Sequence, residues 1–302
     1  MNYENIACIF PGQVIIKEDF FEEISKAKIF TEMYELLCHK LNIDLFQLVK
    51  NKEFEILNKN EISSLLSVLA GCVEYDDFCK NVKNPNYFAG YSVGQWTALY
   101  AAGYLNFERL INIVKIRAEI MNKFIALNPS SMISVIGVSE KLIKQSVEKL
   151  QLQNHFVEIS NYNCFGQYTL SVKKASIEVV MNEFKGHAPR KLLLLPMSGG
   201  WHSSLLNEAA FEFLEFLNTL ELLPLKTPVI DNVTGIFLPS DGKELKSQLA
   251  KHICSPVLWE EGINTLIKSG CKNCFEVGYG NTLTKFGFFI NRSIKHVSYM
   301  IK

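Results

Sequence analysis

The segment Phe88–Trp96 constrains the fold more than any other part of the chain. It contains Gly90-Tyr91-Ser92-Val93-Gly94 after an apolar run, and a helix is expected from about Val93 to Ala102. This G-x-S-x-G order is typical of a nucleophile elbow, a strained turn in which glycines make room around the serine. The hydroxyl of Ser92 should then stand clear of a sheet at a helix N-terminus, where free N–H groups favour negative charge. The alternative is a glycine-rich turn with an incidental serine.

Composition narrows the class of protein. The 302 residues are enough for one large core with a smaller domain inserted in it. Thirty-one basic residues balance 31 acidic ones, which argues against a protein that binds nucleic acid or a membrane surface. No apolar run reaches the length of about 18 residues that a transmembrane helix needs, and the first residues lack the order of a signal peptide. We therefore expect a cytoplasmic protein with no nucleic-acid or membrane partner.

The cysteines give no sign of a metal site. All eight are expected to be reduced in a cytosolic protein. Cys271 and Cys274 form a C-x-x-C motif, but no second pair of cysteines or histidines stands at the spacing of a zinc site. We predict neither a metal nor a resident cofactor.

The order of predicted elements indicates two structural units. Ile6–Phe10 predicts a buried strand ended by Pro11-Gly12, and residues 20–80 predict successive helices. Residues 131–197 follow the order βαββαβ of a ferredoxin-like unit, with strands expected at 132–138, 156–161, 167–172 and 191–197. The α/β pattern then resumes, with a strand expected at Pro228–Ile230. We predict an α/β-hydrolase-like core with a parallel sheet, formed by residues 1–128 and 198–302, and an inserted ferredoxin-like subdomain of residues 129–197.

A nucleophilic serine needs a base, and His202 is the best placed of the six histidines. It follows the predicted buried strand 191–197 and precedes a helix, at a position where α/β folds place sites. A local role at the helix start is the alternative. No aspartate stands between Ser92 and His202, where an ordinary hydrolase triad would have its acid. This favours a Ser-His pair whose imidazole is oriented by another group, such as a backbone carbonyl.

Arg117 is the most informative charged residue. It falls within the apolar stripe of a helix predicted from Asn106 to about Leu127, so its guanidinium should be buried. A buried guanidinium needs an anionic partner. Periodicity leaves open whether this partner is an internal glutamate or the carboxylate of a substrate, which a guanidinium can bind in bidentate fashion.

Together these residues resemble a known family. Phe10-Pro11-Gly12-Gln13, the elbow, Arg117 with Met121, and His202 are similar to motifs of the bacterial malonyl-CoA:acyl carrier protein transacylases and of the acyltransferase domains of polyketide synthases. The resemblance spans essentially the whole chain. It also includes three supporting motifs, which are Asn232-Val233-Thr234-Gly235, Pro256-Val257-Leu258-Trp259 and Glu276-Val277-Gly278-Tyr279-Gly280.

The resemblance implies a role for each matching residue. Ser92 would carry the acyl group as an ester, and His202 would act as base and then as acid, held by a backbone carbonyl near His252. Backbone N–H groups of Gln13 and Val93 would form the oxyanion hole. Arg117 would bind the free carboxylate of a malonyl-type acyl group. The implied substrate site would also include Met121, Trp201, His252 and Asn163, the last in the turn between the second and third strands of the small subdomain. Malonyl-CoA and an acyl carrier protein would be the partners of a monomeric enzyme.

Several residues depart from the family's usual motifs. Tyr91 stands where histidine is usual, Gln95 where glutamate is usual, Ile62 and His252 where glutamines are usual, and Trp201 where smaller residues or phenylalanine are usual. Trp201 would narrow the pocket at the acyl α-carbon. We therefore expect a stand-alone acyltransferase of polyketide or hybrid peptide biosynthesis, whose donor is malonyl-CoA or an unusual malonyl unit on a carrier protein. The alternatives are an editing acyl hydrolase of the same fold and a non-catalytic carrier-protein binding module.

Overall fold

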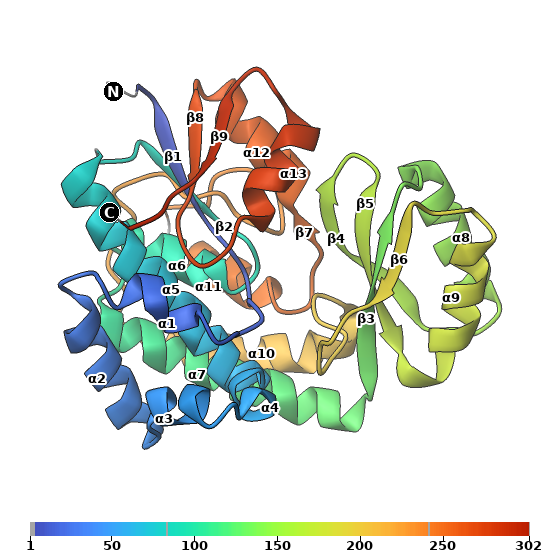
Figure 1. The fold of residues 1–302 in the computed structure, drawn as a ribbon. Coiled ribbons are helices and arrows are strands. Elements are labelled where there is room, and N and C mark those ends of the chain that lie inside the picture. The colour runs from blue at the N-terminus through green and yellow to red at the C-terminus, as the bar shows by residue number, and fades with distance from the viewer. Residues whose placement is uncertain (1–3, 83, 241, 302) are drawn as a thin grey trace.

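The computed structural model describes residues 4–82, 84–240 and 242–301, and its larger part is built around a parallel sheet (Figure 1). The strand order is β2-β1-β8-β9. The strands are β1 (Ile6–Phe10), β2 (Tyr87–Gly90), β8 (Asn273–Glu276) and β9 (Lys295–Ser298). Every residue of β1 is buried, as a parallel strand covered on both faces should be. The predicted α/β fold with a parallel sheet is confirmed.

Helices cover both faces of this sheet. Ile6, Cys8 and Phe10 of β1 belong to one hydrophobic core, whereas Ala7 and Ile9 belong to a second. The first core also contains residues of α1 (Phe20–Ile24), α2 (Phe30–Leu41), α3 (Leu45–Lys50), α4 (Phe54–Leu57), α5 (Asn60–Asn81), α6 (Gly94–Ala101), α7 (Phe107–Leu127), α10 (Asn207–Asn218) and α11 (Gly242–Lys251). The second core contains residues of α12 (Trp259–Lys268) and α13 (Thr282–Ile290). Because side chains alternate along a strand, each face of β1 packs against its own set of helices.

The inserted unit has the strand order of a ferredoxin-like fold. Its strands β3 (Ser130–Ile136), β4 (Val157–Cys164), β5 (Gln167–Lys173) and β6 (Lys191–Leu194) form a sheet in the order β6-β3-β5-β4. The helices α8 (Glu140–Leu152) and α9 (Ile177–Lys185), the latter preceded by the 3₁₀ turn η1 (Lys174–Ser176), connect them. A fifth strand, β7 (Val257–Leu258), pairs in parallel with β4. It comes from the C-terminal part of the chain, and it lies between the two halves of the molecule in Figure 1.

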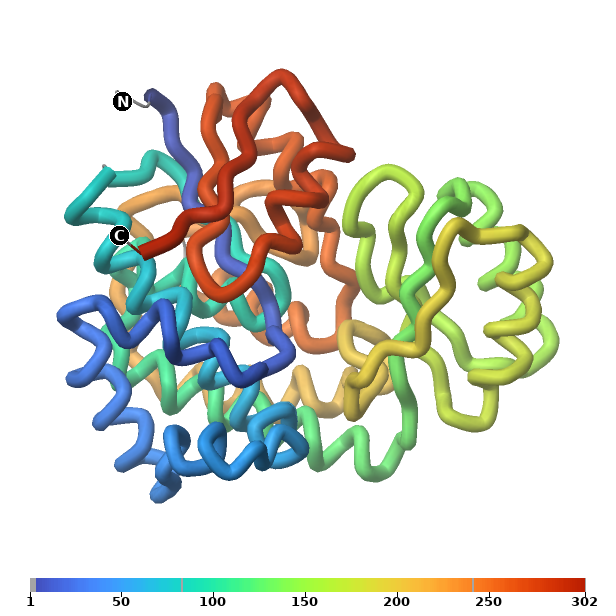
Figure 2. The backbone as a smooth tube through the Cα atoms, viewed as in Figure 1, coloured from blue at the N-terminus to red at the C-terminus, as the bar shows by residue number. Residues whose placement is uncertain are grey.

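Figure 2 traces the two crossings that join the small unit to the large one. The chain enters the small unit after α7 and returns after β6, and both ends of the described chain lie on the large unit. The return segment leads to the 3₁₀ turn η2 (Ser204–Leu206) and then to α10. None of the helices in the described part of the chain is both long enough and apolar enough to cross a membrane.

The structure corrects three local predictions. β4 extends to Cys164, so Asn163 lies in a strand and the hairpin turn is only Phe165-Gly166, where Gly166 has a φ of 71°. Our placement of Asn163 in the turn was therefore wrong. β6 ends at Leu194 and is mostly exposed, so it is not the buried strand expected at 191–197. The segment Pro228–Ile230 makes only isolated bridges, to Phe88 and Phe237, because Pro228 has no N–H to donate to a sheet.

Candidate active site

The elbow between β2 and α6 has the strained geometry that the glycine spacing predicted. Ser92 has a φ of 53°, in the left-handed region that non-glycine residues seldom occupy. A Cβ at position 90 would lie 2.0 Å from the carbonyl oxygen of Gly94, and one at position 94 would lie 2.4 Å from that of Phe10. Both positions therefore require glycine. The turn places Ser92 just before α6, at the carboxyl end of β2.

Asn232 holds this strained turn in place. Its side-chain oxygen accepts a hydrogen bond from the backbone N–H of Ser92 at 2.9 Å, and its side-chain nitrogen donates to the carbonyl oxygen of Gly90 at 2.6 Å. The same nitrogen donates to Oε1 of Gln95, whose own Nε2 donates to the carbonyl oxygen of Ile230 at 2.9 Å. The motif at 232 was noted in the sequence, but its function as a brace for the elbow was missed because the partners are far apart along the chain.

Ser92 and His202 form a hydrogen-bonded pair. Ser92 Oγ lies 2.7 Å from His202 Nε2, and His202 Nδ1 lies 2.8 Å from the backbone carbonyl oxygen of His252. A carbonyl only accepts, so Nδ1 carries the proton and Nε2 is free to accept the proton of the serine hydroxyl. Burial, together with the nearby positive charge of Arg117, lowers the pKa of His202 to about 3. The imidazole is therefore neutral at physiological pH, which is the state that a general base requires.

The position of His202 has a different cause from the one that the sequence suggested. The exposed strand β6 ends eight residues earlier, and the intervening segment is held by serines of the small unit. The N–H of Gly200 donates to Ser130 Oγ at 2.9 Å, Ser203 Oγ donates to the carbonyl oxygen of Gly200 at 2.8 Å, and Ser171 Oγ donates to Ser203 Oγ at 3.0 Å. His202 itself has a φ of 57°. The histidine is thus positioned from the sheet of the small unit.

The backbone N–H groups of Gln13 and Val93, which were predicted to form the oxyanion hole, have no acceptor in the described part of the chain. The loop after β1 lies against the elbow, since the N–H of Tyr91 donates to the carbonyl oxygen of Phe10 at 2.9 Å. Gln13 is anchored through its side chain, which donates to Ser63 Oγ. The two free N–H groups can therefore serve an oxygen that develops negative charge.

Arg117 is buried in α7 without an anionic partner. Arg117 is 2% exposed, and its Nε and Nη2 atoms have no hydrogen-bond partner among the residues that the structure describes. Among the described residues no carboxylate forms a salt bridge with Arg117. The alternative that Arg117 pairs with an internal glutamate, which the sequence left open, is therefore wrong. Burial lowers the pKa of Arg117 to about 10, which still leaves the guanidinium charged at neutral pH. Met121, one turn further along the helix, is equally buried.

Trp201, His252 and Asn163, which were also predicted to contact substrate, lie around the pair in different ways. The six-membered ring of Trp201 packs over Gly199, beside Ile125 of α7. The ring of His252 lies 5.0 Å from that of His202, measured between centroids, at an interplanar angle of 30°. The amide of Asn163 is already occupied, because its Oδ1 accepts the hydroxyl of Tyr91 at 2.7 Å. Asn163 thus connects the small unit to the elbow.

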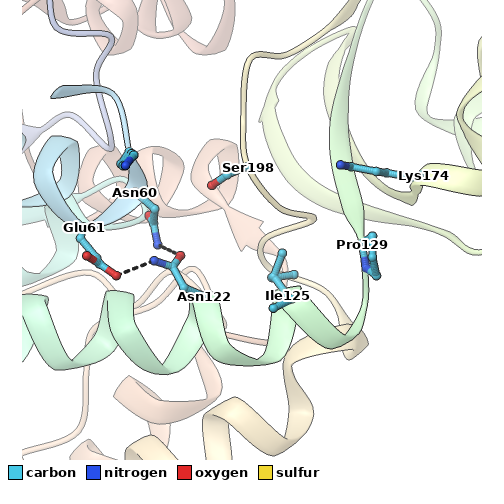
Figure 3. Close-up of a pocket in the computed structure, with 9 residues that line it drawn as sticks. Asn60, Glu61, Asn122, Ile125, Pro129, Lys174 and Ser198 are labelled. Carbon is cyan, nitrogen blue, oxygen red and sulfur yellow. Dashed lines mark hydrogen bonds between the residues drawn. The ribbon is translucent and has the colours of Figure 1, made fainter. Parts of the chain in front are cut away.

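A cavity of about 390 Å³ opens where the two units meet (Figure 3). On its α5 and α7 side, Asn60 donates to Asn122 at 2.9 Å, and Asn122 donates to Glu61 at 2.9 Å. Lys174 extends toward it from the small unit. Ile125 lines the cavity and also lies beside Trp201, so the cavity is one layer of side chains away from the segment that carries His202.

A groove of about 700 Å³ lies between the small unit and α13. Its floor includes Cys164 and Phe286, which belong to the same core as Tyr91. Three cations line it, namely Arg190, Lys191 and Lys285, and Phe165 and Phe289 stand exposed at its edge. No carboxylate side chain lines the groove in the part of the chain that the structure describes.

Comparisons with known proteins agree with this geometry. No family model matches the chain. The malonyl CoA-acyl carrier protein transacylase of Bacillus subtilis is 30% identical over 298 residues, which are 97% of this chain and 92% of that protein. The protein of the same name from Staphylococcus aureus strain COL is 29% identical over 305 residues, 97% of this chain and 94% of that protein.

Solved structures share the fold. An acyl carrier protein S-malonyltransferase from Vibrio cholerae superposes with a TM-score of 0.90 at 24% identity, covering 99% of this chain and 98% of that one. A malonyl-transacylase in complex with its type II PKS acyl-carrier protein superposes with a TM-score of 0.89, also at 24% identity, covering 98% and 94%.

Proposed function

Because this chain belongs to the malonyl-CoA:acyl carrier protein transacylase family, we propose that it moves a malonyl-type acyl group, through an ester on Ser92, to the phosphopantetheine thiol of an acyl carrier protein. The donor is malonyl-CoA or a malonyl unit on a donor carrier protein. Two observations carry the proposal: Ser92 is paired with His202, whose pKa is lowered by burial and by the charge of Arg117, and the buried Nε and Nη2 of Arg117 have no partner in the described chain. Since Ser92 itself carries the acyl group, the reaction needs no metal and no resident cofactor.

In the first half-reaction the hydroxyl of Ser92 attacks the thioester carbon. His202 Nε2 takes the hydroxyl proton as the O–C bond forms, and the carbonyl oxygen becomes an oxyanion. The free N–H groups of Gln13 and Val93 are placed to donate to that oxyanion. The intermediate then collapses, the C–S bond breaks, and the leaving sulfur takes the proton from His202. The products are an acyl ester of Ser92 and a free thiol.

In the second half-reaction the phosphopantetheine thiol of the carrier protein attacks the ester. His202 takes the thiol proton and returns it to Ser92 Oγ as the O–C bond breaks. The backbone carbonyl of His252 holds the imidazole in the tautomer that both steps need, at 2.8 Å from Nδ1. The order of events is ping-pong.

Arg117 supports a dicarboxylic acyl group as the substrate. A malonyl carboxylate matches the unpaired Nε and Nη2 of its guanidinium with two parallel hydrogen bonds. Neutralising Arg117 also removes one of the two effects that lower the pKa of His202, so substrate binding makes the base stronger. Met121 and Trp201 supply apolar surface around the rest of the acyl group.

The groove with Arg190, Lys191 and Lys285 supports an acidic protein partner. Its three cations have no salt-bridge partner in the described chain, and the exposed rings of Phe165 and Phe289 add apolar surface. A carrier protein with an acidic face would complement these charges. The groove adjoins the elbow, since the ring of Phe286 lies 6.2 Å from that of Tyr91, measured between centroids. The departures at positions 91, 95, 201 and 252 favour a stand-alone enzyme of polyketide or hybrid peptide biosynthesis.

The editing hydrolase is the second candidate, because it would use the same serine and histidine. A hydrolase of neutral acyl chains has no use for the buried charge of Arg117, whose burial without a partner is unfavourable in the free protein. A non-catalytic binding module would need neither the strained elbow nor the free N–H groups. The hydrolase therefore does not explain the buried charge of Arg117, and the binding module does not explain the strained elbow or the free N–H groups.

The test is the fate of the acyl group when the protein is mixed with malonyl-CoA and a holo-acyl carrier protein. We expect malonyl to appear on the carrier thiol much faster than free malonate appears in solution. Ser92→Ala should abolish the transfer, while Ser269→Ala, at an exposed serine after α12, should preserve it. Release of malonate at the full rate in the presence of carrier protein would identify the hydrolase instead.

A further inference from the structure

We propose that the acyl pocket selects a malonyl unit with a hydroxyl group on its α-carbon, which the imidazole of His252 recognises. The inference rests on the proposed function, because it concerns the acyl group that Ser92 carries. It goes further by naming the substituent on that group.

The first observation is an imidazole with no hydrogen bonds. The side chain of His252 is 1% exposed, and neither Nδ1 nor Nε2 has a partner in the described chain. Buried polar groups in proteins are nearly always paired, because a group left unpaired loses its hydration without compensation. A buried ring with both nitrogens free therefore points to a ligand that completes its hydrogen bonds.

The second observation is where this ring lies. The backbone carbonyl of His252 holds His202, and the two rings lie 5.0 Å apart. An acyl group on Ser92 must extend from His202 to Arg117 if its carboxylate is to meet the guanidinium. These two residues are also the titratable neighbours that lower the pKa of His252, after burial itself. The imidazole of His252 thus lies beside the path that the acyl chain takes.

The chemistry of the ring defines what it can bind. Burial comes first, and then the neighbouring His202 ring and the Arg117 guanidinium, in keeping the pKa of His252 well below its usual value, so the ring is neutral. A neutral imidazole offers one donor and one acceptor. A carboxylate only accepts, and its two oxygens already match Nε and Nη2 of Arg117, which have no partner in the described chain. The methylene of plain malonyl offers His252 no hydrogen bond.

A hydroxyl group can pair with whichever ring nitrogen it meets, since it accepts from the protonated nitrogen or donates to the bare one. An amino group would be protonated and would place a positive charge beside Arg117. An ether oxygen only accepts. The pocket also limits size, because the ring of Trp201 lies over Gly199 and against the end of α7. Trp201 Nε1 is a further buried donor without a partner in the described chain. A hydroxyl, the smallest group that both donates and accepts, fits these limits.

The experiment is a competition between malonyl-CoA, methylmalonyl-CoA and 2-hydroxymalonyl-CoA at equal concentrations, with the ester on Ser92 quantified by intact-protein mass spectrometry. Methylmalonyl is the matched control, because a methyl group has nearly the size of a hydroxyl but forms no hydrogen bond. We expect hydroxymalonyl to load about tenfold faster than either competitor, the effect of pairing one buried polar group. His252→Phe keeps a flat ring of similar shape and should bring the hydroxymalonyl-to-malonyl ratio close to one. Lys251→Ala, at the exposed neighbouring residue, should keep the wild-type ratio.

Each outcome decides the matter. If the wild-type protein loads hydroxymalonyl no faster than malonyl, His252 is served by a water molecule and the inference is wrong, while the proposed function stands. The same holds if His252→Phe retains the preference. The test does not depend on whether a variant folds, because the hydroxymalonyl-to-malonyl loading ratio of the wild-type protein alone can refute the inference. If no dicarboxylic acyl group loads at all, both the inference and the proposed function are wrong.

Discussion

Replacing Arg117 with methionine should have opposite effects on activity and on stability. Each charge-assisted hydrogen bond from the buried guanidinium to a malonyl carboxylate contributes about 1.5–3 kcal/mol, so the unpaired Nε and Nη2 together account for about 3–6 kcal/mol. We therefore expect kcat/KM for malonyl-CoA to fall about 10²–10⁴-fold. The value for acetyl-CoA, which has no carboxylate, should rise or stay the same.

The same substitution should stabilise the free protein. Burial lowers the pKa of Arg117 from its ordinary value to about 10. At neutral pH the guanidinium is charged in both the folded and the unfolded chain, but the folded chain disfavours that charge. The shift corresponds to a cost on the order of 3 kcal/mol, which Arg117→Met removes. The Tm of the free variant should therefore lie several degrees above that of the wild type.

The assay pairs loading kinetics for the two acyl-CoAs with thermal unfolding. Lys115→Ala is the control, since Lys115 is on the same helix but only half-buried and forms a surface ion pair with Glu119. It should leave both the malonyl preference and the Tm nearly unchanged. An Arg117→Met variant that keeps its preference for malonyl, or that unfolds at a lower temperature than the wild type, would refute the reasoning.

Three further predictions follow from the site and its surroundings. Because the pKa of His202 is lowered to about 3, the base is neutral throughout the physiological range, so kcat/KM for loading should not fall between pH 8 and pH 5; a decline with a midpoint near 6.5 would contradict this. Burial raises the pKa of Glu74 from 4.5 to about 8, so the folded state retains a proton that the unfolded state loses, and stability should decrease from about pH 4.5 to pH 8 by at most about 1.4 kcal/mol per pH unit. Glu74→Gln should raise Tm more at pH 8 than at pH 5, and a pH-independent difference would count against the shift. Charge reversal of Arg190 and Lys285 should raise KM for the carrier protein several-fold without changing loading from malonyl-CoA; equal effects on both substrates would show that the groove is not the docking surface.

The features that could be predicted from the sequence depend on residues that are close together along the chain. The elbow follows from the spacing of Gly90 and Gly94 around Ser92, because the space needed at each glycine is fixed by the turn and the strand beside it. The burial of Arg117 follows from helical periodicity, since its neighbours along α7 face the same core. The ferredoxin-like order followed from the succession of elements, which the strand pairing then bore out.

The features that could not be predicted depend on contacts between distant parts of the chain. The partner of Arg117 could not be chosen from periodicity, which gives the buried face but not what lies opposite. Asn232 supports Ser92 from 140 residues away, and no local pattern marks that pairing. Asn163 was misplaced because β4 continues to Cys164, three residues beyond the predicted end of the strand at 161. His202 was found for a reason that the fold does not support, since serines of the small unit position it.

The measurement closest to the central claim is peptide mapping of the protein quenched after a short incubation with malonyl-CoA. We predict that the malonyl group is found as an ester on Ser92 and that it disappears when a holo-carrier protein is added before the quench, with an equal amount of malonyl appearing on the carrier. A malonyl group attached to any other residue, or transfer to the carrier that continues at the wild-type rate in Ser92→Ala, would contradict the account.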